Sequence, residues 1–388
     1  MLILDGGRVL TMTGQVHDPG RLFMRGGKIV AVGNVAELPL PPAEEGWAVL
    51  DVAGKWILPG LIDAHTHVGI SEQSVGREGA DVNETTDPVT PHLRAIDATN
   101  PEDEAFRDAL SAGITVVNVM PGSANVIGGL AVALKTAGTR IDRMVVRNPS
   151  GLKAAMGENP KKTYGDQKKM PGTRLAIAGL LREQFVRAQT YLEKQAGAEP
   201  GRPFERDLRL EALGMVLRHE IPLRVHAHRA DDILTALRVR DEFGYDMVLD
   251  HATEAFKVAD ELTRRNIPAV LGPLLTSRYK VELRERNLKS AARLVAAGVK
   301  VALTTDHWVV PIQHLLLGLL LSVKEGLPRE QALARVTRNP AEILGIADRV
   351  GTLEAGKDAD VVVWSGDPLD LMSRVEQVWV DGERAYGA

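Results

Sequence analysis

Apolar strand-like runs that alternate with helical patterns constrain the fold of this chain more than any other feature. Apolar residues recur every three to four positions, as in helices, most clearly at residues 102–112, 174–195, 230–243, 253–265, 285–297 and 311–324. Eight strand-like runs accompany them, at residues 61–67, 114–120, 143–147, 151–157, 222–228, 246–251, 267–271 and 299–305. Such alternation is typical of parallel βα units. The pattern predicts an α/β fold, a (β/α)8 TIM-like barrel, which takes about 250 residues or more of the 388 in the chain.

The two ends of the chain differ from this middle, because both consist of short strands and turns. Residues 1–55 contain three strand-like stretches, with Gly6-Gly7 and Gly26-Gly27 at hairpin-type turns. Strand and hairpin patterns return at residues 349–366 and 375–387. Strands at both ends of an α/β middle predict that the termini pair with each other. We therefore expect a composite β-sandwich domain of residues 1–56 plus 347–388 and a barrel domain of residues 57–346.

The composition limits the classes of function. Hydrophobic residues at 44% and charged residues at 25% are ordinary for a globular protein, and a net charge of -4 gives no basic surface for nucleic acid or an anionic membrane. The first residues, MLILDGGRVL, do not resemble a secretory signal, and no apolar run is long enough to span a membrane. We expect a cytoplasmic protein. Because there is no cysteine, a metal would have to bind His, Asp, Glu or a modified Lys.

Metal-competent side chains cluster at the predicted C-terminal strand ends, where barrels of this kind carry their chemistry. These residues are His65, His67, His226, His228, His251, Asp306 and His307. Residues two apart in an extended strand share a face, so each His-x-His pair presents both imidazoles to one side. Neutral imidazole nitrogens suit zinc and similar divalent ions. The pattern therefore predicts a metal site on this rim.

The segment PGLIDAHTH, at residues 59–67, resembles the first barrel strand of the amidohydrolase superfamily of metal-dependent hydrolases. Residues 339–364, NPAEILGIADRVGTLEAGKDADVVVW, are similar to that superfamily's exit from the barrel into its β-sandwich. The resemblance implies one or two divalent ions, zinc first with iron or manganese as alternatives, held by His65, His67, His226, His251 and Asp306. The additional imidazole of His228 is assigned to hydrogen bonding with a ligand or the substrate. The His-Ala-His strand end is most similar to the imidazolonepropionase-related and prolidase-like branch.

Many members of this superfamily bridge two metal ions with a carboxylated lysine or a glutamate, and residues 150–165 offer both. Strand alternation places Leu152, Ala154 and Met156 against the helices and points Lys153 into the barrel. A buried ammonium is costly, and carboxylation would convert the lysine into an anionic oxygen ligand. Glu158, just past the strand, is the rival, so both residues are candidate ligands.

Candidate substrate contacts lie in loops near the predicted rim. His92 belongs to the polar, aperiodic insertion at residues 76–101, and Tyr164 follows the candidate bridging segment. Arg278 and Lys280 follow the seventh strand, where Arg suits a substrate carboxylate. Residues 121–129, PGSANVIGG, are interpreted as a loop that offers backbone donors over the site.

The resemblance implies that these residues belong to a metal-dependent hydrolase of a carbon–nitrogen bond (amide, cyclic amide or dipeptide-like) in a small molecule. Asp306 is the expected general base, which takes a proton from the attacking water and passes it to the leaving nitrogen. His228, or the neighbourhood of His251, is expected to polarise the carbonyl further. The alternatives are a non-catalytic scaffold with this fold, or a metal-dependent decarboxylase or isomerase. The expected partner is a small-molecule substrate, and homo-oligomerisation stays open.

Overall fold

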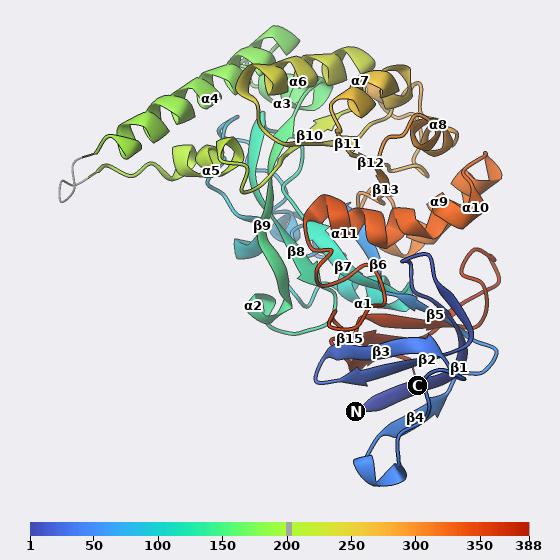
Figure 1. Cartoon of the computed structure of the whole chain (residues 1–388). Coiled ribbons are helices and arrows are strands. Elements are labelled where there is room, and N and C mark those ends of the chain that lie inside the picture. Colours follow the sequence, from blue (N-terminus) through green and yellow to red (C-terminus); the bar gives the residue numbers. More distant parts are fainter. Residues whose placement is uncertain (199–203, 388) are drawn as a thin grey trace.

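The computed structural model describes residues 1–198 and 204–387, whose strands form two eight-stranded sheets. One sheet contains strands from both chain ends in the order β16-β15-β14-β5-β1-β2-β3, with β4 paired to β1. The other is the barrel sheet, with the order β13-β12-β11-β10-β9-β8-β7-β6. Figure 1 shows the terminal sheet below the barrel, with both chain ends in it.

The terminal sheet joins the two ends of the chain through the antiparallel pair β5 and β14, in which Ile57 lies opposite Val363. Its strands are β1 (Leu2–Leu10), β2 (Val16–Arg25), β3 (Lys28–Asn34), β4 (Ala48–Asp51), β5 (Trp56–Pro59), β14 (Val361–Trp364), β15 (Val375–Val380) and β16 (Glu383–Tyr386). Leu4, Leu22 and Val361 are fully buried in its apolar core. The predicted barrel with a β-sandwich from both termini is confirmed, whereas the domain limits 1–56 plus 347–388 and 57–346 stay a prediction.

The barrel strands and the helices carry the rest of the chain. The strands are β6 (Leu61–Thr66), β7 (Ile114–Val119), β8 (Ile127–Lys135), β9 (Val145–Ala155), β10 (Leu223–Ala227), β11 (Met247–His251), β12 (Ala269–Leu271) and β13 (Val301–Leu303). The α-helices are α1 (Glu104–Ser111), α2 (Ile141–Met144), α3 (Glu158–Asp166), α4 (Arg174–Ala196), α5 (Leu208–Leu217), α6 (Ala230–Phe243), α7 (Ala259–Arg264), α8 (Ser290–Ala296), α9 (Leu315–Lys324), α10 (Arg329–Ala332) and α11 (Arg338–Leu344). Short 3-10 helices are η1 (Ala43–Glu45), η2 (Gly76–Gly79), η3 (Ala95–Asp97), η4 (Ala255–Lys257), η5 (Val281–Leu283), η6 (Ile312–His314) and η7 (Leu333–Val336).

The third barrel strand differs from the sequence prediction. Of residues 143–147 and 151–157, predicted as two strands, 145–147 and 151–155 belong to the single strand β9, and β8 occupies part of the predicted loop 121–129. β8 runs antiparallel to both β7 and β9. A parallel neighbour needs a crossover of about a dozen residues or more, and residues 120–126 are too few for one. The prediction of parallel βα units was therefore wrong here, while the other barrel neighbours do pair in parallel.

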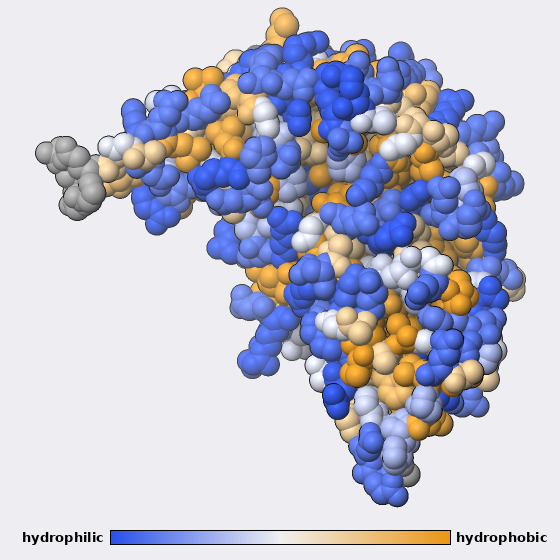
Figure 2. All heavy atoms as spheres, in the orientation of Figure 1, coloured by the Kyte–Doolittle hydropathy of each residue, from blue (hydrophilic) through white to orange (hydrophobic). Residues whose placement is uncertain are grey.

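Helices cover the outside of the barrel, and small apolar side chains fill part of its interior. Ile62, Val116, Val248 and Ala302 form an interior cluster with α11. Helices α4 and α5 project from the barrel as a hairpin (Figure 1). Figure 2 shows mainly hydrophilic residues on the visible face, with hydrophobic side chains gathered over the terminal sheet and along this hairpin. None of the helices in the described part of the chain is long and apolar enough to cross a membrane.

Candidate metal centre

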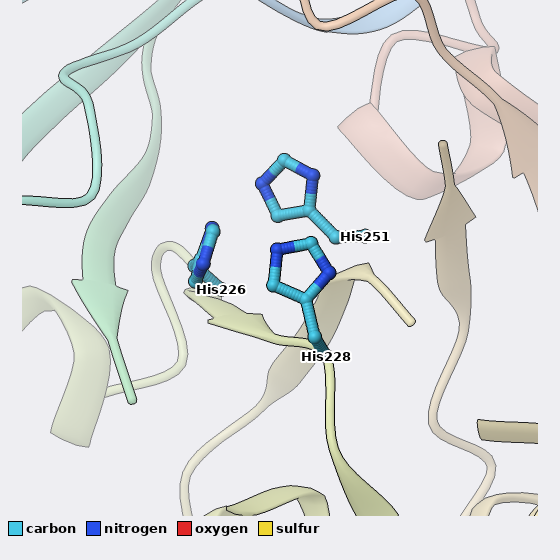
Figure 3. Close-up of side chains that lie close together, drawn as sticks. All are labelled: His226, His228 and His251. Carbon is cyan, nitrogen blue, oxygen red and sulfur yellow. The ribbon is translucent and has the colours of Figure 1, made fainter. Parts of the chain in front are cut away.

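The C-terminal ends of the barrel strands bring two groups of potential metal ligands to one small cavity of about 110 Å³. The first group is His65, His67 and Asp306, and the second is His226, His228 and His251. Within each group the ligand atoms lie within 4.8 Å of one another. Figure 3 shows the three imidazoles of the second group close together above the ends of their strands.

Asp306 lies between the two groups. Its Oδ1 atom is 3.4 Å from His65 Nε2 and 3.3 Å from His67 Nε2. Its Oδ2 atom is 3.9 Å from His251 Nδ1, in the other group. Burial alone would raise the pKa of Asp306, but its interactions with His251 and His67, together with the charge of Lys153, hold it below its ordinary value. Asp306 is therefore an ionised carboxylate between two sets of nitrogen ligands.

Strand alternation explains why β10 presents its histidines to the cavity. Leu223, Val225 and Ala227 belong to the apolar cluster shared with the outer helices, so His226 and Arg224 point the opposite way. His251 and Asp306 reach the cavity by a different route. Their φ angles of 70° and 55° are left-handed, a conformation that non-glycine residues seldom adopt. His251 is the last residue of β11, and Asp306 lies three residues after the end of β13.

Three histidines have their Nδ1 atoms turned toward other protein groups. His67 Nδ1 is 2.7 Å from the Met120 carbonyl oxygen, and His251 Nδ1 is 2.9 Å from that of Gly272. Because a carbonyl only accepts hydrogen bonds, these Nδ1 atoms carry the proton and leave Nε2 with a free lone pair. His228 Nδ1 is 2.8 Å from the Thr253 hydroxyl. The imidazoles are thus oriented before any ligand binds.

His65 is oriented by a fully buried ion pair beneath it. His65 Nδ1 is 3.1 Å from Asp250 Oδ1, and the same carboxylate accepts hydrogen bonds from Arg224 at 2.6 and 3.2 Å. Burial would raise the pKa of Asp250, but the Arg224 guanidinium and His65 lower it well below its usual range. A charged carboxylate behind a histidine fixes the ring orientation and makes the imidazole a better ligand.

The buried histidines are held in the neutral form that binds metals. Burial lowers the pKa of His65 and of His251 to about 3, and burial with neighbouring charges also lowers those of His226 and His228. His226 Nδ1 and His228 Nε2 are buried nitrogens without a hydrogen-bond partner in the described chain. Neutral imidazoles with unpartnered nitrogens, close to a carboxylate, fit the donor set of zinc and similar ions.

Lys153 lines this cavity, whereas Glu158 does not. Leu152, Ala154 and Met156 pack in the outer apolar cluster, as predicted, and Lys153 Nζ is 3.4 Å from His65 Nε2. Burial lowers the pKa of Lys153 to about 8, which increases the fraction of neutral amine. Glu158 begins α3 outside the cavity. This placement favours Lys153 over Glu158 as the bridging ligand, although the role itself stays a prediction.

The three predicted substrate contacts lie outside the cavity. His92 lines a separate surface hollow with Arg94 and Leu130. Tyr164 is fully buried, and its hydroxyl donates to Asn125 Oδ1 at 2.6 Å, which gives it a structural partner. Arg278 donates to the backbone carbonyls of Arg284 and Arg286, both at 2.9 Å, and so holds its own loop.

Of the cations predicted after the seventh strand, Lys280 does line the cavity, and residues that the sequence did not single out join it there. These additional residues are Ser123, Asn159, Tyr279 and Trp308. Tyr279 is 61% and Trp308 53% exposed, so two aromatic side chains lie at the mouth of the cavity. Asn159, Tyr279 and Trp308 are each next to a residue that the sequence analysis names, and Ser123 lies in the predicted loop 121–129. Their positions next to named residues were therefore the signal by which they could have been found.

Comparison with known proteins gives the same assignment. The sequence signature of the amidohydrolase family matches residues 56–386. An imidazolonepropionase from Aromatoleum aromaticum is 32% identical over 388 residues, which cover 92% of this chain and 88% of that protein. The amidohydrolase tasK of Hapsidospora irregularis is 31% identical over 392 residues and 95% of this chain, but the chain spans only 40% of the length of that relative.

A solved structure agrees over the whole fold. The crystal structure of an amidohydrolase from Thermotoga maritima MSB8 superposes with a TM-score of 0.96 and 42% sequence identity, covering 100% of both chains. The predicted resemblance to the imidazolonepropionase-related branch is confirmed by these similarities. The chain therefore belongs to the amidohydrolase family and is a hydrolase of carbon–nitrogen bonds.

Proposed function

We propose that this hydrolase uses one or two divalent metal ions to cleave an amide, cyclic amide or dipeptide-like bond in a small molecule. The observation that carries the proposal is the position of Asp306, within 4 Å of histidine nitrogens from both ligand groups. A carboxylate in that position can contact two ions or one ion and a reacting water. Zinc is the first expectation, with iron or manganese as alternatives.

The ligand atoms divide naturally between two positions. His65 and His67 with Asp306 would hold one ion, and His226 with His251 would hold the other. Lys153, as a carboxylated side chain, would bridge them. When bound, such ions polarise the carbonyl of the substrate and lower the pKa of a water molecule to about 7.

The chain's own residues supply the proton transfers. Asp306 is ionised and faces the cavity, so it can take a proton from the attacking water and return it to the leaving nitrogen. The Thr253 hydroxyl next to His228 Nδ1 can donate to that nitrogen, which leaves the Nε2 proton free to bond the substrate carbonyl oxygen. Asp250 and Arg224 keep His65 in place during the reaction.

The buried histidine cluster supports catalysis over a scaffold role. Taking polar groups out of water without partners is costly, and a scaffold has no physical need for several such imidazoles around a carboxylate. A metal-dependent decarboxylase or isomerase would use similar ligands, so product analysis separates it from a hydrolase. A cytoplasmic location stays a prediction from the sequence.

Metal dependence is tested by elemental analysis together with an assay for released amine. We expect one or two equivalents of a transition metal, amine release from a panel of N-acyl amino acids, dipeptides and cyclic amides, loss of activity on chelation and recovery on adding zinc or manganese. His226→Asn should lose metal and activity. The matched control is His219→Asn, because His219 is exposed and pairs with Asp246 at 3.0 Å on the surface. Protein without metal, and without activity after metal is added, would refute the proposal.

A further inference from the structure

Lys280 is a cation at the catalytic cavity that the proposed chemistry does not use. Among the described residues that line the cavity, the lysines are Lys153 and Lys280, and no arginine is present. Lys153 lies against His65, whereas Lys280 comes from the loop after β12 and is on the side of Asn159. The Lys280 side chain is only 14% exposed. An additional, largely buried positive charge thus faces the space where a substrate must bind.

Lys280 has unused hydrogen-bonding capacity. Its Nζ donates to Asn159 Oδ1 at 3.3 Å, a neutral acceptor. The carboxylate nearest to it in the described chain is that of Glu282, at 4.0 Å, which is too long for a hydrogen bond. An ammonium group has three donors, so the contacts of Lys280 leave donors free for an anion.

The loop holds Lys280 in a fixed position. Glu282, two residues further on, is buried and accepts hydrogen bonds from the Glu158 backbone N–H at 2.6 Å and from Arg174 at 3.0 Å. These contacts attach the Lys280 segment to the start of α3 and to α4. Because the carboxylate of Glu282 is already bound by these donors, it does not compete fully for Lys280. A pre-positioned cation loses little freedom when a ligand binds.

Asn159 connects Lys280 to the metal ligands. Asn159 Nδ2 is 3.4 Å from His226 Nε2 and donates to Ser123 Oγ at 2.8 Å. The two contacts of Asn159 and the two bonds of its amide group together span about 9 Å, which is therefore the greatest distance between Lys280 Nζ and His226 Nε2. An anion on Lys280 would therefore be only a few covalent bonds from a carbonyl held at the ligands. Tyr279 and Trp308 add aromatic surface beside this path.

We propose that Lys280, with Asn159 and Ser123, forms a carboxylate subsite that selects the substrates of this enzyme. The substrate class is an amide with a carboxylate a few bonds from the scissile carbon–nitrogen bond, and with an apolar group against Tyr279 and Trp308. N-acyl amino acids, dipeptides and cyclic amides with a short acidic side chain meet this description. The substrate class rests on the proposed hydrolase function, whereas carboxylate binding at Lys280 does not.

The test compares matched acids and amides on the metal-loaded enzyme. N-acetyl-leucine and N-acetyl-phenylalanine are measured against their C-terminal primary amides, both as calorimetric Kd and as kcat/KM. We expect the wild type to prefer each acid, and Lys280→Met to weaken acid binding about 10- to 100-fold while changing amide binding little, because charge-assisted hydrogen bonds contribute on this scale. Lys289→Met removes an exposed lysine nine positions away and should change neither ratio.

The outcomes separate the subsite from the reaction. If a carboxylate binds only through the metal, Lys280→Met keeps the acid-to-amide Kd ratio of the wild type, and the subsite is refuted. Equal or undetectable binding of acid and amide by the wild type also refutes it. If acids bind through Lys280 but no probe of either series is hydrolysed, the subsite stands and the proposed hydrolysis of this class fails.

Discussion

Breaking the buried Arg224–Asp250 ion pair should destabilise the protein and loosen the metal ligand His65. Arg224 and Asp250 are both fully buried, with nitrogen–oxygen distances of 2.6 and 3.2 Å. Unit charges about 4 Å apart attract by about 4 kcal/mol at an effective dielectric constant of about 20. Removing one partner of such a pair costs about 3–5 kcal/mol, because the other charge stays buried alone.

The two single substitutions should differ in size. In the metal-free protein, where Lys153 is not carboxylated, Asp250→Asn leaves Arg224 next to the Lys153 ammonium without a counter-ion, whereas Arg224→Met leaves Asp250 close to the positive charge of Lys153. We therefore expect Asp250→Asn to lower the free energy of unfolding by about 4–5 kcal/mol and Arg224→Met by about 3 kcal/mol. The double variant should cost at least about 2 kcal/mol less than the sum, since both charges disappear together.

Urea unfolding followed by circular dichroism measures these changes, with metal content determined on the same samples. Asp250→Asn should also weaken metal binding about 10- to 100-fold, because a partner behind a ligand histidine typically contributes that much. The matched control is the surface pair Arg182–Glu242, with a 2.5 Å contact and both side chains more than a third exposed. Arg182→Met there should cost less than about 1 kcal/mol. Additive single effects at Arg224 and Asp250, or a cost as small as that of the control, would refute the reasoning.

Further predictions concern catalysis, the bridging ligand and pH. Asp306→Asn should fold and keep most of its metal but lose on the order of 10²-fold or more in kcat; near-normal turnover of the metal-loaded variant would assign the proton transfer to another group, with His228 the first to test. Lys153→Ala should lose the second metal by elemental analysis, with partial rescue by a short carboxylic acid, whereas metal loss only in Glu158→Ala would make the glutamate the bridge. Burial raises the pKa of Glu282 to about 7 from 4.5, so its contribution to stability is full below about pH 4.5 and is lost as the pH rises through 7. Relative to the wild type, Glu282→Gln should therefore gain about 2–3 kcal/mol between pH 5 and pH 8 in urea unfolding, and Glu285→Gln on the exposed side of the loop is the control; a difference that is constant with pH, or that falls, would contradict it.

Local periodicity predicted those parts of the site that lie within regular strands. The inward direction of Lys153 follows from the outward packing of Leu152 and Ala154, and the shared face of His226 and His228 follows from the same alternation. Helix α6 begins and ends where its apolar spacing predicts, at residues 230 and 243. In each case the cause is local, because side-chain direction in a strand or helix depends only on backbone repeat.

The antiparallel direction of strand β8 could have been predicted from the sequence, but only from the lengths of the connections on either side of it. Residues 120–126 and 136–144 are both too short to return the chain for a parallel neighbour. Gly128 and Gly129 made this region read as a loop, whereas the alternation that follows belongs to a strand paired on both sides. Glycine within a strand marks a close approach of another segment, and the backbone of Leu93 lies against Gly129.

The periodic pattern of the sequence could not predict which loop side chains enter the cavity. The sequence offers Arg278 and Lys280 as equivalent cations two positions apart, yet backbone carbonyls bind the first and the cavity receives the second. His251, at the end of β11, and Asp306, three residues after β13, likewise reach the cavity through left-handed backbone conformations. A repeat of two residues would point Asp250 and not His251 inward, and Asp250 does lie inside the barrel, against Arg224. The site uses both residues because the left-handed φ of His251, the last residue of β11, takes its side chain out of the strand alternation.

The closure of the barrel and the geometry of the first ligand group have the same physical origin. Strands β6 and β13 are the two ends of the hydrogen-bonded order, with no ladder between them in the described chain. Asp63 takes the place of that ladder, since its carboxylate accepts hydrogen bonds from the Thr305 backbone N–H at 3.0 Å and from the hydroxyl groups of Thr304 and Thr305 at 2.6 Å. Thr304 Oγ1 in turn accepts from the Asp306 N–H at 3.1 Å. The distance between Asp306 and the histidines of β6 therefore depends on a buried carboxylate whose partners lie more than 200 residues along the chain. A constraint of this kind leaves no periodic trace in the sequence, because it acts only after the two strands have met.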